Sequence, residues 1–161
     1  MDGYMQRILD TLGEHDPIEV LQATPQRLGG LLETMAPSDL ERSYAPGKWD
    51  ARHLFAHLAD VELGVGFRLR LTLGQPGVEL PAFDQDAWAE RYRRLDPSLA
   101  VEAFRGLRAW NLSLLSTLTL EDWLAEGYHP ERGFESVDLM VRFLAGHDIN
   151  HLAQLESIVA L

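Results

Sequence analysis

The spacing of apolar residues near the C-terminus constrains the fold more than any other feature of this sequence. From Ser136 onward, apolar side chains return every three or four residues, as on one face of an α-helix. Continued from Leu144, this spacing reaches His147 and then His151, one turn apart on the face that a core must cover. A buried imidazole without hydrogen-bond partners costs a few kcal/mol. The pair therefore predicts a shared ligand, and a metal ion would satisfy both rings.

Three further segments show the same helical spacing, and no segment shows convincing strand alternation. We therefore predict an all-α four-helix bundle, in which ligand sites are built from inward side chains of facing helices. Pro25 is expected to break or kink the first helix. Gly64 and Gly66 lie inside the second, where each costs about 1 kcal/mol relative to alanine, so we expect them to allow close packing or to leave space for a ligand. The four expected helices are 17–35, 51–73, 98–117 and 136–161.

Long connections with short extra helices join the expected helices. Segment 74–97 begins with Gly and Pro, contains a short helical stretch at 84–94, and is long enough to form a crossover or a lid. The length of 161 residues suits a single domain, 1–161, of the four-helix-bundle type. The other expected segments are an N-terminal amphipathic arm at 1–13 that lies on the body, a loop at 36–49 with one helical turn at 38–42, and a second long connection at 120–135.

The composition narrows the chemistry and the partners. There is no cysteine, which excludes a disulfide framework, a thiolate nucleophile of the chain's own and a cysteine-ligated zinc site. The net charge is -11, and the few arginine groupings do not form a basic stripe, so nucleic acid is not an expected partner. No run approaches the roughly 20 apolar residues that cross a bilayer, and no targeting segment is visible. We expect a cytoplasmic protein with no membrane partner.

The second expected helix offers a third metal ligand. His53 and His57 are four residues apart, and with 100° per residue His57 lies about 40° from Val61 at the flank of the apolar stripe. His53 is turned about 40° further and is expected to be solvated. His57 with His147 and His151 would leave coordination positions open, as in catalytic or substrate-binding metal sites. Neutral imidazoles suit Zn or Ni, with Fe, Co and Mn as alternatives.

Two motifs resemble those of the DinB-like superfamily, also called the DinB or YfiT four-helix metalloprotein family. The segment PGKWDARHLFAHLADVELGVGFRLR, residues 46–70, is similar to its second-helix signature, in which Gly-Lys-Trp precedes His-Leu-x-Asp and a later Arg. The segment AGHDINHLAQLE, residues 145–156, is similar to its closing motif of two histidines followed by a Gln. The resemblance implies a four-helix bundle over nearly the whole chain and assigns the metal ligands to His57, His147 and His151. It assigns no catalytic base.

Four polar residues are candidates for supporting roles. Asp60, Asn150 and Gln154 each lie within a turn of a proposed ligand and could orient an imidazole, although ordinary polar helix positions explain them equally well. Arg68 could bind a substrate carboxylate through two parallel hydrogen bonds, or it could pair with an acidic residue such as Glu62.

The family resemblance also implies a metal-dependent enzyme. Characterised members include thiol-dependent S-transferases, which use a divalent metal to bind a low-molecular-weight thiol such as bacillithiol or mycothiol, and related isomerases. A chain without cysteine would have to take its sulfur from such a cosubstrate, and a metal deprotonates a thiol without a protein base. We therefore expect a thiol S-transferase that acts on small electrophiles.

Two alternatives remain. The same site with bound water could hydrolyse a small substrate, with Asp60 or a carboxylate from 74–97 as the base. A non-catalytic stress-response bundle that binds metal would instead use its apolar faces for dimerisation. A homodimer is expected only by analogy with relatives.

Overall fold

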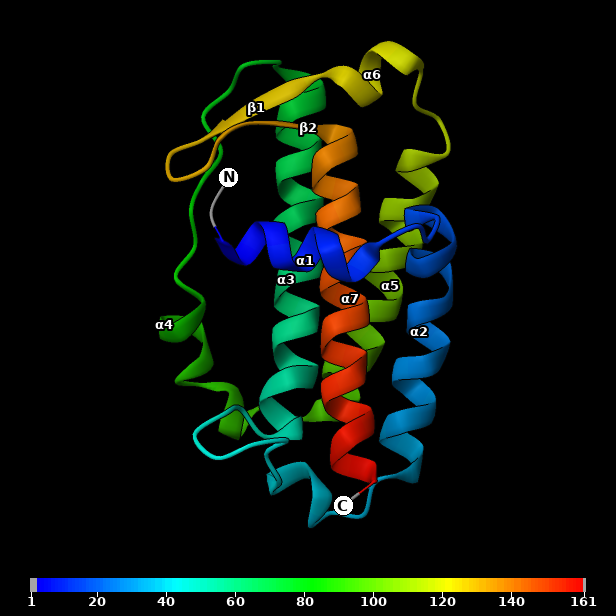
Figure 1. The fold of residues 1–161 in the computed structure, drawn as a ribbon, viewed down its shortest axis with the longest axis vertical. Coiled ribbons are helices and arrows are strands. Elements are labelled where there is room, and N and C mark those ends of the chain that lie inside the picture. Colours follow the sequence, from blue (N-terminus) through cyan, green and yellow to red (C-terminus); the bar gives the residue numbers. More distant parts are fainter. Residues whose placement is uncertain (1–2, 161) are drawn as a thin grey trace.

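The computed structural model describes residues 3–160, and its four long helices form a bundle (Figure 1). They are α2 (Pro17–Thr34), α3 (Ala51–Gly74), α5 (Pro97–Leu115) and α7 (Val137–Val159). Both α2 and α3 pack against α5 and α7, so α2 and α3 occupy opposite corners. The predicted four-helix bundle is confirmed. None of the helices in this part of the chain has the length and apolarity needed to cross a membrane.

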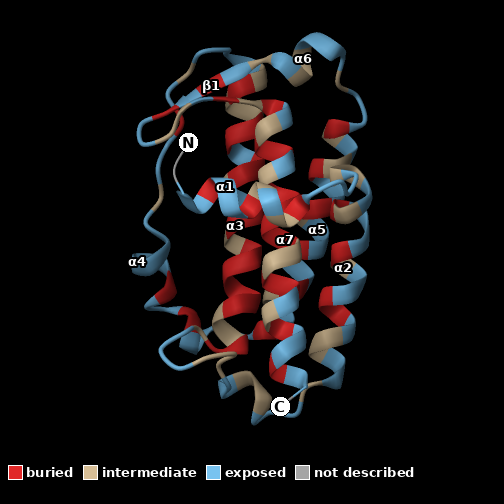
Figure 2. Cartoon of the chain, viewed as in Figure 1, coloured by how far each residue is buried: buried red, intermediate tan, exposed pale blue. Residues whose placement is uncertain are grey.

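Side-chain caps explain why the long helices begin where they do. In each case a carboxylate or hydroxyl oxygen accepts a hydrogen bond from a backbone N–H of the first turn, which has no partner within the helix. Burial then runs along the inner faces, most visibly on α3 and α7 (Figure 2). The four capping residues are Asp16, Asp50, Asp96 and Ser136.

The connection between α3 and α5 returns along the length of the bundle, because these two neighbouring helices run parallel (Figure 1). It carries α4 (Gln85–Ala89) and the short 3-10 helix η2 (Tyr92–Arg94), within the stretch where a short helix was expected. A second 3-10 turn, η1 (Asp39–Glu41), lies between α2 and α3, also as expected. The segment 75–96 is therefore the crossover of the bundle.

The structure contains a β-hairpin that the sequence analysis missed. After α6 (Leu120–Leu124), strands β1 (Glu126–His129) and β2 (Gly133–Ser136) pair antiparallel, with Glu126 opposite Ser136. The crossover joins this hairpin, because the Leu80 N–H donates to the Tyr128 carbonyl at 2.7 Å. Strands of four residues are too short for an alternating pattern to stand out in the sequence.

Helix α1 (Gly3–Leu12) lies across α7, as expected of an arm on the body (Figure 1). Its buried face consists of Met5, Ile8 and Leu12. A Cβ atom on Gly146 would stand only 2.2 Å from the Ile8 carbonyl oxygen. Glycine at 146 therefore lets the two helices touch, one residue before His147.

Pro25 does not break α2, which continues through it. Because proline has no N–H, the Leu21 carbonyl loses its helical donor. Arg108 on α5 replaces it, donating from Nη1 to that oxygen at 2.9 Å. Arg108 also pairs with Glu62 and Asp148, both at 2.7 Å, in the middle of the bundle. The apolar spacing gave no sign of this buried charged cluster.

Candidate metal centre

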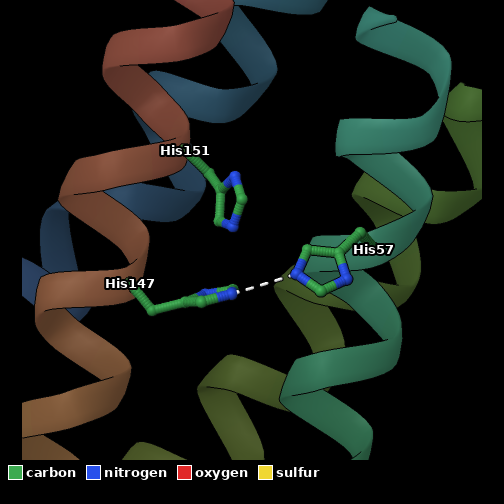
Figure 3. Close-up of side chains that lie close together, drawn as sticks. All are labelled: His57, His147 and His151. Atoms are coloured by element: carbon green, nitrogen blue, oxygen red, sulfur yellow. Dashed lines mark hydrogen bonds between the residues drawn. The ribbon is translucent and has the colours of Figure 1, made fainter. Parts of the chain in front are cut away.

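Helices α3 and α7 bring three histidines together inside the bundle (Figure 3). His57 projects from α3, while His147 and His151 project from successive turns of α7. All three are buried, and one ring nitrogen from each can be chosen so that all lie within 4.8 Å of one another. These are the three residues expected from the sequence to share a site, and the fold brings them into one cluster.

The hydrogen bonding of the cluster is incomplete. The Nε2 atoms of His57 and His147 face each other at 3.0 Å, while the Nδ1 atoms of both rings have no partner. If one Nε2–H donates to the other Nε2, the accepting neutral ring carries its proton on Nδ1, where no acceptor is available. His151 Nε2 also lacks a partner, although its Nδ1 lies 2.7 Å from Gln154 Oε1.

Burial keeps these imidazoles neutral. It lowers the pKa of His57 to about 3 and that of His151 to about 4, with the neighbouring His151 adding to the effect at His57. The pKa of His147 is also lowered, by burial first and then by the charges of His151, His57 and Arg108. At neutral pH each ring therefore has a lone pair to offer.

The donor set fits a divalent metal ion. An ion among the three rings would use the facing Nε2 atoms, because His151 Nε2 has no partner and those of His57 and His147 have only each other. Neutral imidazole is also a common ligand of transition metals. Three protein ligands leave positions open for a nucleophile or substrate. Gln154 accepts from His151 Nδ1–H, which fixes the tautomer with the Nε2 lone pair directed at the site.

The other predicted side chains take different positions. Asp60 accepts a hydrogen bond from the Tyr92 hydroxyl at 2.8 Å rather than orienting an imidazole. Asn150 faces the same cavity as His151, with no hydrogen bond to a ring among residues 3–160. His53 is not solvated, since its side chain is 12% exposed and its Nδ1 contacts Asp50 at 2.7 Å. Of the predicted orienting residues, Gln154 alone within the described range contacts the cluster.

Two cavities flank the centre. The larger, about 590 Å³, is lined by His147 together with Arg68 and Phe83. The smaller, about 440 Å³, is lined by both His57 and His151. Tyr4 of α1 and Gln85 of α4 line both, so the N-terminal helix and the crossover form their shared wall.

The two interior glycines of α3 allow close packing. A Cβ on Gly64 would meet Phe83 of the crossover at 2.8 Å, and one on Gly66 would meet Asn111 Nδ2 at 2.6 Å. Each glycine thus admits a neighbouring side chain, so close packing explains both positions.

Several site residues were not selected from the sequence. Trp49 packs on the His57 ring with centroids 4.8 Å apart, and it lines the smaller cavity beside Lys48. Both belong to the Gly-Lys-Trp motif, which could have indicated them. His129 and Arg132, from the hairpin, line the larger cavity. No spacing in the sequence connects the hairpin with the helices.

Comparisons with known proteins agree with this architecture. A family model described as the DinB superfamily matches residues 21–155. A relative from Oceanobacillus iheyensis, named as a proposed metal-dependent hydrolase, is 31% identical over 88% of this chain and 83% of its own. The Bacillus subtilis relative YfiT, named in the same way, is 27% identical over 88% of this chain and 81% of its own.

Solved structures match as well. The structure of Bacillus subtilis YfiT superimposes with a TM-score of 0.85 at 27% identity, over 88% of this chain and 83% of that one. A mycothiol-dependent maleylpyruvate isomerase matches with a TM-score of 0.67 at 14% identity, over 86% of this chain and 59% of that one. At this identity, the match to the isomerase shows a shared fold.

Proposed function

The chain belongs to the DinB superfamily, and on this basis we propose that it is a divalent-metal-dependent enzyme that activates a nucleophile against a small molecule. The observation that carries the proposal is the cluster of three buried, neutral imidazoles between two cavities. His57, His147 and His151 would hold the ion, with Zn or Ni as the first candidates and Fe, Co or Mn as alternatives.

A low-molecular-weight thiol is the nucleophile that suits this site best. A divalent ion held there would lower the pKa of a thiol or a water molecule and so supply a nucleophile near neutral pH. Glu62 and Asp148 are both engaged by Arg108, and Asp60 by Tyr92. Each of these three carboxylates thus already has a partner, and thiol activation by a metal needs no protein base. The mycothiol dependence of one protein with this fold also makes thiols the first nucleophiles to test.

The chain's own residues would position the reactants. Gln154 keeps His151 in the ligating tautomer, and Trp49 covers the His57 ring and shields it from water. The two cavities offer separate spaces for a thiol and an electrophile on either side of the histidines.

Hydrolysis is the second candidate, favoured by the names of the relatives in Oceanobacillus and Bacillus. Water would then be the nucleophile, and Asp86 of the crossover, which lines the smaller cavity, is a candidate base.

Metal content tests the site itself. Elemental analysis of the purified protein should find close to one equivalent of a divalent metal, which is lost in a His147→Ala, His151→Ala double variant. His53→Ala is the matched control, because His53 lies on α3 outside the cluster, and this variant should keep the metal. Wild-type protein that resists loading with each of Zn, Ni, Fe, Co and Mn would refute the proposed metal enzyme.

Nucleophile dependence separates the two reactions. The metal-loaded protein is assayed with small electrophiles in the presence and absence of thiols, and with esters and amides without thiol. The thiol proposal expects turnover only when thiol is present. Thiol-free hydrolysis would establish the second candidate, and full metal occupancy without any turnover would favour a non-catalytic metal-binding bundle.

A further inference from the structure

Among residues 3–160, the two buried arginines have very different partners. Arg108 is 1% exposed and meets the carboxylates of Glu62 and Asp148. Arg68 is 6% exposed and has no salt bridge within this range. A buried charge without a counter-ion costs several kcal/mol, so the surroundings of Arg68 require an explanation.

Arg68 is held in place by neutral groups. Its Nε and Nη2 atoms donate to the Pro81 carbonyl at 3.1 and 2.7 Å. Its guanidinium carbon lies 4.6 Å from the centre of the Phe83 ring, which itself packs on Gly64. These contacts orient the planar group without neutralising its charge, and they leave both Nη1 hydrogens uncommitted.

The pKa values follow the same contrast. Burial lowers the pKa of Arg68 to about 10, the nearby Arg132 adds to this, and the carboxylates of Glu135 and Glu131 offset part of it. Burial would also lower the pKa of Arg108, but the charges of Asp148 and Glu62 outweigh it and raise that pKa. Arg68 therefore remains a cation at neutral pH without a salt bridge among the described residues.

The free side of Arg68 faces the larger cavity, whose lining includes His147 of the metal centre. His129 shares this lining, and its Nδ1 accepts from the Glu131 N–H at 3.2 Å, so the neutral ring has its proton on Nε2. Arg132 also lines the cavity but is already paired with Glu135. Among the described residues, Arg68 is thus the arginine of this lining that forms no salt bridge, although Asp84 and Glu131 also line the cavity.

We propose that Arg68 binds a carboxylate of the small molecule whose reactive end reaches the metal centre. This inference rests on the proposed function and specifies its substrate class, an elongated thiol or electrophile with a terminal carboxylate. The 11 residues from His57 to Arg68 correspond to a helical rise of about 16 Å. Arg68 and His147 line the same cavity, so a chain of several carbon atoms with a carboxylate at one end could reach from Arg68 toward the histidines.

Binding of bifunctional probes tests the inference. Co²⁺-loaded protein is titrated with ω-mercaptocarboxylates of increasing length and with ω-mercaptoalcohols of the same lengths, using the absorbance of thiolate bound to cobalt. We expect the carboxylates to bind about 10- to 100-fold more tightly, with an optimum at an intermediate length, because a carboxylate can form two charge-assisted hydrogen bonds with Arg68. Arg68→Gln should abolish this preference while the alcohols still bind.

Two control variants sharpen the comparison. Arg142→Gln removes the same charge from an exposed position of α7 that lines neither cavity, and it should leave the preference intact. Arg68→Lys keeps the charge but loses the planar fork, so it should retain part of the preference and answers the question if Arg68→Gln fails to fold. Equal binding of carboxylates and alcohols by the wild type, or a preference that survives in Arg68→Gln or undiminished in Arg68→Lys, overturns the inference.

The two proposals fail in different ways. If the mercaptoalcohols do not bind the cobalt ion, the result counts against the thiol function. The Arg68 inference is then tested with hexanoate, which carries a carboxylate but no thiol. Its binding is followed by the fluorescence of Trp88, whose ring stacks on Phe83 with centroids 4.8 Å apart. Hexanoate must bind the wild type and not Arg68→Gln, and any other result overturns the inference. Where turnover is found, kcat/KM identifies the carboxylate's source. If the thiol carries the carboxylate, Arg68→Gln should lower kcat/KM for a mercaptocarboxylate with an uncharged electrophile. If the electrophile carries it, the variant should lower kcat/KM for an uncharged thiol with a carboxylated electrophile.

Discussion

Gln154 holds one imidazole of the cluster by its outer nitrogen, and the rings of His57 and His147 have no such support among residues 3–160. Loss of an outer partner typically weakens metal binding by about 10- to 100-fold. We expect Gln154→Ala to lower metal affinity by this factor in a titration against a competing chelator. Asn150 lines the same cavity without contacting a ring, so Asn150→Ala should change the metal affinity little. Equal affinities of the two variants would show that Gln154 does not orient His151.

The lowered pKa values of the histidines predict how the stability of the metal-free protein depends on pH. The pKa of His57 is about 3 and that of His151 about 4, against an ordinary value of 6.5 for an unfolded chain. Between these limits the unfolded state binds more protons, so the free energy of unfolding is greatest above pH 6.5 and falls as the pH drops, by up to about 1.4 kcal/mol per pH unit for each ring.

Urea denaturation at about pH 7.5 and pH 5 measures this effect. A variant with Gln in place of His57, His147 and His151 should lose most of the difference. A wild-type free energy of unfolding that is the same at both pH values would contradict the burial of neutral rings.

Sequence spacing led to the three clustered histidines because their burial follows the same helical period as that of the apolar residues. His147 and His151 continue an apolar stripe, and His57 borders another. The spacing could not predict that Arg108 is buried. Its charge is matched by carboxylates from two other helices, which meet it only in the folded chain. Arg68 was selected as a carboxylate-binding candidate, but its actual contact, the Pro81 carbonyl, comes from a crossover with no periodic pattern.

At the scale of elements, α1 is fixed by its contact with α7 at Gly146. A methyl group there would overlap the Ile8 carbonyl, and such overpacking typically costs about 1–3 kcal/mol. We expect Gly146→Ala to loosen α1, with faster hydrogen exchange over residues 3–12 and a lower free energy of unfolding.

Gly30→Ala is a control, because a Cβ at this exposed position in α2 meets nothing within 4 Å. It should not weaken the protein. Unchanged exchange in α1 of the Gly146 variant would mean that the helix crossing tolerates a side chain.

The long helices were predictable to within a few residues because caps and apolar stripes agree. The hairpin was not, since its four-residue strands are stabilised by pairing with each other and by the Leu80 and Tyr128 backbone contacts. The continuity of α2 through Pro25 likewise depends on a distant donor, Arg108, that local sequence rules do not include.

For the whole molecule, a metal at the cluster would link α3 to α7, two helices distant in the sequence. A ligand present at 100 times its dissociation constant stabilises the native state by about 2.7 kcal/mol if it does not bind the unfolded chain. We expect loading with Zn²⁺ or Ni²⁺ to raise the Tm by about 5–10 °C and a chelator to reverse the change.

The His147→Ala, His151→Ala variant separates this effect from nonspecific binding. Its Tm should not respond to either metal. An equal rise in this variant would place the stabilising ion elsewhere.

The position of α1 also bears on how the protein should be purified. Tyr4 lines both cavities, whereas α7 ends at Val159 at the far end of the bundle (Figure 1). A polyhistidine tag fused before α1 would place surplus imidazoles beside the cluster, where they could fill open coordination positions or carry nickel from the affinity resin into the site. A tag after α7, or one removed by protease, keeps foreign ligands away and makes the measured metal content that of the protein itself.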